Sequence, residues 1–145
     1  MKDIFKKFLR IQFIKFCIVG GLGFVTDMAV FTILKNLLQA ESKLLLNIIP
    51  LFGYIAAVTQ NYLINHFWTF GDQTKKISPS KKAYAIFFAV SLTALMPRYI
   101  VYNYILSSFG KSGLYPEFAN FVGIVAATVF NFIGSKYFVF VKKEK

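Results

Sequence analysis

The chain has 145 residues, a length that suits one domain, and 57% of them are hydrophobic while 16% are charged. Soluble domains are roughly 45–50% apolar and about 25% charged, so the composition indicates a membrane protein rather than a soluble one. The net charge of +11 does not indicate nucleic-acid binding, because the basic residues form short clusters at the ends of apolar segments. Anionic lipid headgroups are the expected partners of such clusters. The single cysteine, Cys17, excludes an internal disulfide.

The N-terminal segment, residues 1–15, mixes five basic residues with Ile, Phe and Leu at helical spacing. This pattern predicts a short amphipathic helix that lies along the membrane interface. The apolar run after it is too long for the core of a signal peptide, and no small-residue cleavage motif follows at the right place. We therefore expect an uncleaved first membrane helix over residues 16–38.

Three more apolar segments predict membrane helices over residues 44–65, 83–107 and 115–135. Each has close to the roughly 20 residues that cross a 30 Å hydrocarbon core. Pro97 lies inside the third of them and should kink it, because proline removes one backbone hydrogen bond. The predicted fold class is an all-α membrane protein with four transmembrane helices.

One stretch of the sequence occurs twice. Residues 53–70 (GYIAAVTQNYLINHFWTF) and 123–140 (GIVAATVFNFIGSKYFVF) align at an offset of 70, with identical Gly, Ala, Asn and Phe at equivalent positions. Such self-similarity indicates a tandem duplication. The repeat halves cover about 12–70 and 83–140, and the polar segment 71–82 links them within a single membrane domain over residues 1–145.

The distribution of basic residues predicts the orientation. The N-terminal segment has five, the linker four and the C-terminal end four, whereas the two connections on the other side have three, and these are Lys35, Lys43 and Lys111. The positive-inside rule therefore places both termini and the linker in the cytoplasm. Because each half crosses the membrane twice, the halves are expected to be parallel repeats, related by an axis along the membrane normal.

Two charged residues, Asp27 and Arg98, lie within predicted membrane helices. Such residues cost about 2.5–3.5 kcal/mol each on insertion scales and suggest a functional site. Aligning Phe16 with Phe87 gives an offset of 71 that also aligns Asp27 with Arg98. We expect these two to face each other across the interface between the halves. Three interpretations remain open, namely a structural ion pair, a site where Arg98 meets an anionic substrate group while Asp27 holds it or binds sugar hydroxyls, and an accidental placement.

Asn61 and Asn131 form a second equivalent pair. In lipid, an Asn commonly forms a hydrogen bond to a neighbouring helix, worth about 0.6–2 kcal/mol. Contact with a sugar or a phosphate is the functional alternative. Gln60 is a further candidate for lining the same cavity.

His66 and Lys136 stand beside aromatic clusters at the predicted cytoplasmic ends of the second and fourth helices. An aromatic belt with snorkelling cations explains this arrangement without a ligand. The alternative is capture of a lipid phosphate at the inner leaflet, where Lys15 lies at a comparable level. With one His, one Cys and few acidic residues, the sequence offers little for catalysis or metal binding, so we expect neither enzyme activity nor a cofactor.

The segments KFCIVGGLGFVTDMAVFTIL, NYLINHFWTF and, more weakly, NFIGSKYFVF resemble the GtrA-like family of small four-span membrane proteins. The resemblance covers about residues 12–141. It implies a role in polyprenyl-phosphate-linked sugar metabolism, in which a lipid such as undecaprenyl-phosphate-glucose is flipped across the cytoplasmic membrane beside a polyprenyl-phosphate glycosyltransferase. The family more often has Arg at the position of His66 and Asn at that of Ser135.

The first hypothesis is translocation of a polyprenyl-phosphate sugar through a laterally open groove lined by the polar membrane residues. Four helices enclose little space, which makes a homo-oligomer one option. The second hypothesis is a non-transporting partner that recruits or stabilises a glycosyltransferase. A third, a small multidrug exporter, would need a membrane acid as its proton carrier, and Asp27 is its one candidate.

Overall fold

The structure is a computed structural model that describes residues 2–39, 43–110 and 115–141. Within these ranges the regular elements are helices, and no strand occurs. The chain divides into two compact units, Met1–Pro79 and Ser80–Lys145, with the boundary inside the polar segment 71–82. The predicted all-α membrane fold is confirmed.

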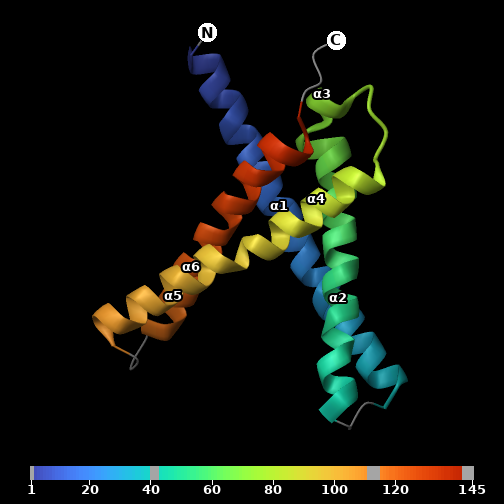
Figure 1. The fold of residues 1–145 in the computed structure, drawn as a ribbon, viewed down its shortest axis with the longest axis vertical. Coiled ribbons are helices and arrows are strands. Elements are labelled where there is room, and N and C mark those ends of the chain that lie inside the picture. The colour runs from blue at the N-terminus through green and yellow to red at the C-terminus, as the bar shows by residue number, and fades with distance from the viewer. Residues whose placement is uncertain (1, 40–42, 111–114, 142–145) are drawn as a thin grey trace. The chain divides into compact units, whose positions relative to one another are not determined.

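Unit 1 is a helical hairpin with a short added segment after its second helix. It contains α1 (Lys2–Leu37), α2 (Lys43–Ile64), the π-helix η1 (Asn65–Thr69) and the single turn α3 (Gly71–Thr74). Figure 1 shows α1 and α2 packed side by side.

Residues 1–15 were expected to form a short amphipathic lead-in along the membrane interface, and their position at the interface stays a prediction. Residues 2–15 are the first part of α1, which is one continuous helix of 36 residues. The physical reason is that no Gly or Pro occurs between residues 2 and 15 to end the helix. A helix of this length is about 54 Å long at 1.5 Å per residue, so it extends well beyond a hydrocarbon core of about 30 Å.

Unit 2 consists of α4 (Lys81–Thr93), α5 (Leu95–Phe109), α6 (Tyr115–Gly134) and the π-helix η2 (Ser135–Val139). Its hairpin is formed by α5 and α6, with α4 packed against α6 and η2. The hydroxyl of Ser80 caps α4 by accepting a hydrogen bond from the backbone N–H of Ala83 (3.1 Å), a typical N-cap interaction.

The third predicted helix is broken at Ala94, between α4 and α5. Pro97 has no N–H to donate to the carbonyl of Thr93, four residues earlier, and its ring crowds that carbonyl. The regular helix therefore ends at Thr93 and restarts at Leu95. The predicted distortion is confirmed, and it lies one turn before the proline itself.

In both units the last long helix, α2 or α6, ends in a π-helical turn. The N–H of Phe70 donates to the carbonyl of Asn65 (2.8 Å), and the N–H of Phe140 donates to that of Ser135 (2.9 Å). These bonds span five residues instead of four, so one extra residue is inserted per turn. Such π-turns are rare and frequently mark functional sites.

The final aromatic residue of each repeat is fully buried against the first helix of its own unit. Phe70 is 0% exposed and its ring lies edge-on to Phe16, with centroids 6.3 Å apart. Phe140 is 1% exposed and lies 5.9 Å from the ring of Phe87. The two pairs occupy equivalent positions at offsets of 70 and 71, so the duplication read from the sequence extends to the packing.

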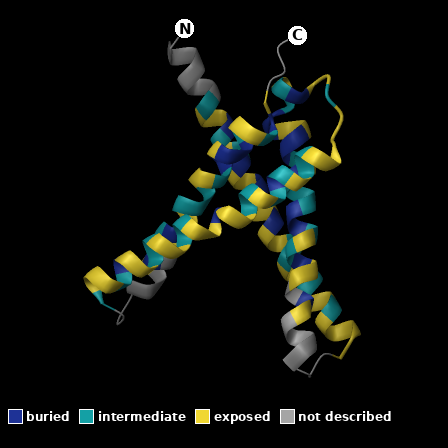
Figure 2. Ribbon diagram, in the orientation of Figure 1, coloured by how far each residue is buried: buried dark blue, intermediate teal, exposed yellow. Residues whose placement is uncertain are grey.

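Among the described residues three helical segments are long and apolar enough to cross a membrane, namely Leu9–Leu37, Lys81–Phe109 and Phe121–Val139. The 22-residue helix α2 is the fourth predicted span. Exposed residues run along the lengths of these helices (Figure 2), and many of them are large and apolar, as expected for surfaces that face lipid. Some of the basic residues behind the predicted orientation lie outside the described residues, so the orientation stays a prediction; these are Lys111, Lys142, Lys143 and Lys145.

Candidate functional site

Asp27 lies on α1 at the point where this helix passes Gly53 of α2. A Cβ atom added at Gly53 would overlap the Asp27 Oδ1 atom and would lie 2.8 Å from the Asp27 backbone oxygen. Small residues allow helices in membranes to approach closely. Gly53 therefore lets α1 and α2 meet, and the carboxylate of Asp27 lies directly on the α2 backbone at that contact.

Unit 2 repeats this contact with the opposite charge. A Cβ atom added at Gly123 of α6 would lie 2.9 Å from the backbone oxygen of Arg98 and 3.3 Å from its Cγ atom. Asp27–Gly53 and Arg98–Gly123 are thus matching helix contacts, one in each repeat. The geometry supports the alignment of Asp27 with Arg98, while their predicted interaction with each other stays a prediction.

More polar residues lie along the contact between α1 and α2. The hydroxyl of Thr26 donates to Gln60 Oε1 (2.6 Å), and a Cβ atom at Gly23 would lie 2.8 Å from the amide carbon of Asn61. The Oδ1 atom of Asn61 is buried and accepts no hydrogen bond within the part of the chain that the structure describes. We call Thr26, Asp27, Gln60 and Asn61 the polar seam of unit 1.

Unit 2 has a shorter polar seam, formed by Ser91, Asn131 and Ser135. Asn131 Nδ2 donates to Ser91 Oγ (3.5 Å) and Ser135 Oγ donates to Asn131 Oδ1 (3.4 Å). Both distances are long for hydrogen bonds, so each interaction is weak. Asn131 nevertheless links α6 to α4, which is the interhelical bond that the structural interpretation of the sequence predicts.

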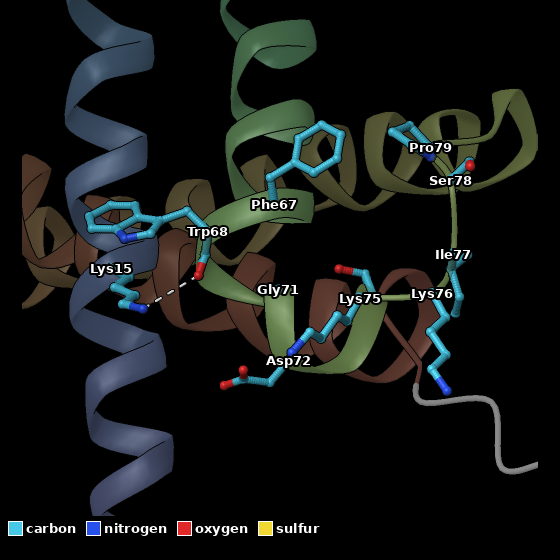
Figure 3. Close-up of a pocket in the computed structure, with 11 residues that line it drawn as sticks. Lys15, Phe67, Trp68, Gly71, Asp72, Lys75, Lys76, Ile77, Ser78 and Pro79 are labelled. Atoms are coloured by element: carbon cyan, nitrogen blue, oxygen red, sulfur yellow. Dashed lines mark hydrogen bonds between the residues drawn. The ribbon is translucent and has the colours of Figure 1, made fainter.

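At the predicted cytoplasmic end of unit 1, Lys15 is held by Trp68. The Lys15 Nζ atom donates to the backbone oxygen of Trp68 (3.4 Å) and lies 5.4 Å from the centroid of its indole ring, within the range of a cation–π interaction. Figure 3 shows this pair with its hydrogen bond as a dashed line. Lys15 from α1 and Trp68 from η1, far apart in sequence, therefore form one wall of a pocket.

This pocket, the linker pocket, is open on one side and has a volume of about 640 Å³. Lys75 and Lys76 line it together with Lys15, and Asp72 is the one acidic residue of the lining. The sequence shows the linker as basic but does not indicate that it folds back beside Trp68. The complete lining is Lys15, Phe67, Trp68, Gly71, Asp72, Thr74, Lys75, Lys76, Ile77, Ser78 and Pro79.

His66 is 3% exposed and stands behind the linker pocket rather than in its lining. Its Nε2 atom is hydrogen-bonded to the carbonyl oxygen of Ile77 (2.8 Å). The hydroxyl of Thr74 donates to the backbone oxygens of His66 (2.5 Å) and Phe70 (3.1 Å). These bonds tie the linker to η1. Lys136 occupies the equivalent position in η2 and is half-buried, and a ligand role for either residue stays a prediction.

Among the described residues no group of three or more His, Cys, Asp or Glu side chains is arranged to hold a metal ion. No curated protein matches the sequence. Residues 15–140 match the family model described as GtrA/DPMS, transmembrane domain, which covers both hairpins and the linker. The chain therefore belongs to the GtrA/DPMS transmembrane-domain family and is a membrane protein of polyprenyl-phosphate-linked sugar metabolism.

Proposed function

We propose that this protein translocates a polyprenyl-phosphate-linked monosaccharide, such as undecaprenyl-phosphate-glucose, across the cytoplasmic membrane for glycosylation of a cell-surface polysaccharide. Both termini and the linker lie on the cytoplasmic side in this proposal. Family membership supports this lipid class, and the observation that carries the transport step is the polar seam between apolar helices in each unit.

The energetic problem of transport is the headgroup. A hydroxyl or amide that enters an apolar medium without a hydrogen-bond partner costs roughly 2–7 kcal/mol, and a charged phosphate costs more. The prenyl tail can remain in lipid, so the protein needs to replace only the water around the sugar and the phosphate. In this proposal the polar side chains between the apolar helices meet this need.

The seam of unit 1 is rich in acceptors that suit sugar hydroxyls. Asp27 offers a carboxylate, and Asn61 offers a buried amide oxygen without a partner in the described structure. A hairpin used only as an anchor would gain stability from apolar residues at these positions, because charged side chains in a membrane helix are costly. In unit 2, Arg98 supplies a guanidinium, the group best matched to a phosphate.

The proposal assigns the chain no chemical step, and net flux would follow the gradient of the lipid or of a coupled ion. The test is reconstitution into liposomes with a labelled polyprenyl-phosphate sugar, measuring the fraction of label accessible from each leaflet. We expect equilibration to be at least about tenfold faster than in protein-free vesicles, a change of about 1.4 kcal/mol in barrier. Equal rates with and without protein would refute transport.

An Asn61→Leu variant tests whether the seam carries the transport. Removing the buried amide oxygen should lower the equilibration rate by about tenfold, while Phe24→Leu, on a lipid-exposed part of α1, should leave it unchanged. Equal losses in the two variants would show that the rate depends on general packing, not on the seam.

A second candidate function is a non-transporting partner that recruits or stabilises a polyprenyl-phosphate glycosyltransferase. The description of the matched family supports this second candidate, because one family model covers both GtrA and a transmembrane domain named DPMS. Co-purification of a glycosyltransferase with the full chain, combined with no lipid translocation in clean vesicles, would support this function over transport.

A further inference from the structure

We propose that the linker pocket of unit 1 binds the phosphate of a phosphate ester, with Lys15, Lys75 and Lys76 as its cations and Trp68 covering the esterified group. The inference rests on the proposed function for the source of the ligand, a polyprenyl-phosphate lipid whose headgroup docks here at the membrane surface. The binding site itself is argued from the geometry of unit 1.

The charges of the pocket leave a positive surplus. Three ammonium groups and one carboxylate line it, from Lys15, Lys75, Lys76 and Asp72. Like charges around one concave surface raise the local potential and attract an anion, although in Figure 3 the Lys76 side chain extends away from that of Lys15. A polyprenyl-phosphate sugar is a phosphodiester with one negative charge, and the same lipid without its sugar is a monoester with about −1.5 to −2 charges at pH 7, so the surplus is enough for either.

Lys15 is already positioned to donate to such an anion. Its ammonium group uses one N–H on the backbone oxygen of Trp68 and is held over the indole ring. An ammonium group has three donors, so two remain for phosphate oxygens. The hydrogen bond is long at 3.4 Å and therefore weak, so the contact with the indole ring is what restricts the side chain before a ligand arrives and reduces the conformational entropy lost on binding.

The aromatic side of the pocket favours an ester over a free anion. Trp68 and Phe67 line the pocket next to the cations and both are exposed. An indole ring combines an apolar face with a polar edge and suits a membrane interface. A sugar ring or the first isoprene unit can pack on this face while the phosphate meets the lysines. The volume of about 640 Å³ lies within the roughly 300–1,000 Å³ typical of small-ligand sites.

The second repeat does not carry the same groups. At the offsets of 71 and 70, the position of Lys15 is occupied by Ile86 and that of Trp68 by Phe138. The α-helix and the π-turn are duplicated, but the ammonium group and the indole are present in unit 1 alone among these equivalent positions. The pocket is therefore a specialisation of the first repeat.

His66 acts in this site as a positioning residue. Its bond to the Ile77 carbonyl, together with the bond from Thr74 to the His66 carbonyl, holds the linker that presents Lys75 and Lys76. In this arrangement His66 affects phosphate affinity through the position of the linker.

Trp68 is the single tryptophan of the chain, so intrinsic fluorescence reports on this pocket specifically. The experiment is a titration of the full chain, in phosphatidylcholine nanodiscs, with a short isoprenyl phosphate. We expect a saturable change in Trp68 emission that the corresponding isoprenol does not produce. Inorganic phosphate should compete only at a concentration at least about tenfold higher, a difference of about 1.4 kcal/mol.

The Lys75→Gln/Lys76→Gln double variant should bind the isoprenyl phosphate at least about tenfold more weakly, because it removes two charge-assisted hydrogen bonds to the phosphate. The matched control is Lys81→Gln/Lys82→Gln, which removes two exposed lysines at the start of α4 that do not line the pocket. Its affinity should equal that of the wild type.

His66→Gln retains a donor near the Ile77 carbonyl and should keep affinity within a few-fold, whereas His66→Ala should weaken it while Trp68 emission without ligand also shifts. Equal weakening in the pocket variant and the lysine control would overturn the proposal, since it would indicate a general charge effect. An equal response to phosphatidylglycerol, or equal affinity for inorganic phosphate, would also overturn it, by assigning the pocket to any anionic lipid or to free phosphate.

The titration requires no transport, so the two proposals fail separately. Saturable binding by a protein that does not equilibrate lipid across vesicles would refute translocation alone. Normal translocation by a wild-type protein that shows no saturable binding would refute the pocket alone.

Discussion

The two units share their packing and differ in their chemistry. A glycine packs against a charged residue in each unit, between α2 and α1 in unit 1 and between α6 and α5 in unit 2. The Phe that follows each π-turn is buried against a Phe of α1 or α4. The polar seam is not preserved in the same way. Thr26 and Gln60 form a hydrogen bond in unit 1, whereas Pro97 and Phe130 occupy the equivalent positions of unit 2 and cannot form it.

This difference indicates which parts of a duplicated hairpin are free to change. The close helix contacts need a glycine where the two backbones meet, and the buried aromatic contacts need a side chain large enough to fill the space. Few residue types satisfy either condition. A hydrogen bond along the seam can be lost if both partners become apolar together, since neither is then left unsatisfied. Pro97 in place of Thr26 also explains why α1 is continuous while α4 and α5 are separate helices.

The largest expected effect comes from the buried Phe pair. Phe70→Ala and Phe140→Ala should each destabilise their unit by about 3–5 kcal/mol, as large cavities in packed interiors do, and by similar amounts because the two contacts are equivalent. Phe67→Ala and Phe138→Ala, at positions that are each 67% exposed, are the matched controls. Thermal unfolding in detergent, followed by circular dichroism, measures all four. If only one of the two substitutions lowered the unfolding temperature, the two Phe contacts would not contribute equally to stability.

The glycine contacts should follow. Gly53→Leu and Gly123→Leu force atoms into Asp27 and Arg98, and the expected loss is about 1–3 kcal/mol or more for each hairpin. Gly20→Leu is the control, because a Cβ atom there meets nothing within 4 Å. The midpoint of detergent-induced unfolding reports the difference. If Gly20→Leu were as damaging as Gly53→Leu, helix contact at Gly53 would not be the cause.

The opposite charges at equivalent positions give a prediction about transport. Asp27→Asn and Arg98→Gln should each lower lipid equilibration by about tenfold or more at normal protein abundance, roughly 1.4 kcal/mol. Under the proposed substrate role, the double exchange Asp27→Arg/Arg98→Asp should not restore the rate. Recovery of the rate in the exchanged variant would instead support a structural ion pair.

The smallest effects concern the seam hydrogen bonds. Thr26→Val should cost about 0.6–1.7 kcal/mol, the range for hydrogen bonds between membrane helices, because it leaves Gln60 without its 2.6 Å donor. Ser91→Ala should cost less, since the bond from Asn131 is 3.5 Å long. A greater loss for Ser91→Ala in the same unfolding assay would contradict the view that unit 1 has the stronger seam.

Much of the fold follows from the sequence alone. A bilayer requires long apolar helices, so the membrane spans appear directly in the hydropathy, and the duplication is visible as matching residues at a constant offset. Pro97 marked the break in the third helix for a local reason, the loss of one backbone hydrogen bond. The charged and amide residues of the polar seams were also recognisable, because such side chains are rare inside membrane helices, whereas their hydroxyl partners Thr26 and Ser91 were not singled out by the sequence.

The tertiary structure decided what depends on contacts between distant residues. The π-turns at the ends of α2 and α6 form where Phe70 and Phe140 pack on the first helix of their units, a contact that no local pattern specifies. The linker pocket forms because two hydrogen bonds hold the linker beside η1, one from His66 to the Ile77 carbonyl and one from the Thr74 hydroxyl to the His66 carbonyl. Lys15 contacts Trp68 from 53 positions away in the sequence. Hydropathy and repeat matching indicate whether a residue lies in an apolar or a polar environment, but they do not indicate which distant residue it contacts. The polar linker was therefore evident from the sequence, whereas the pocket that it forms was not.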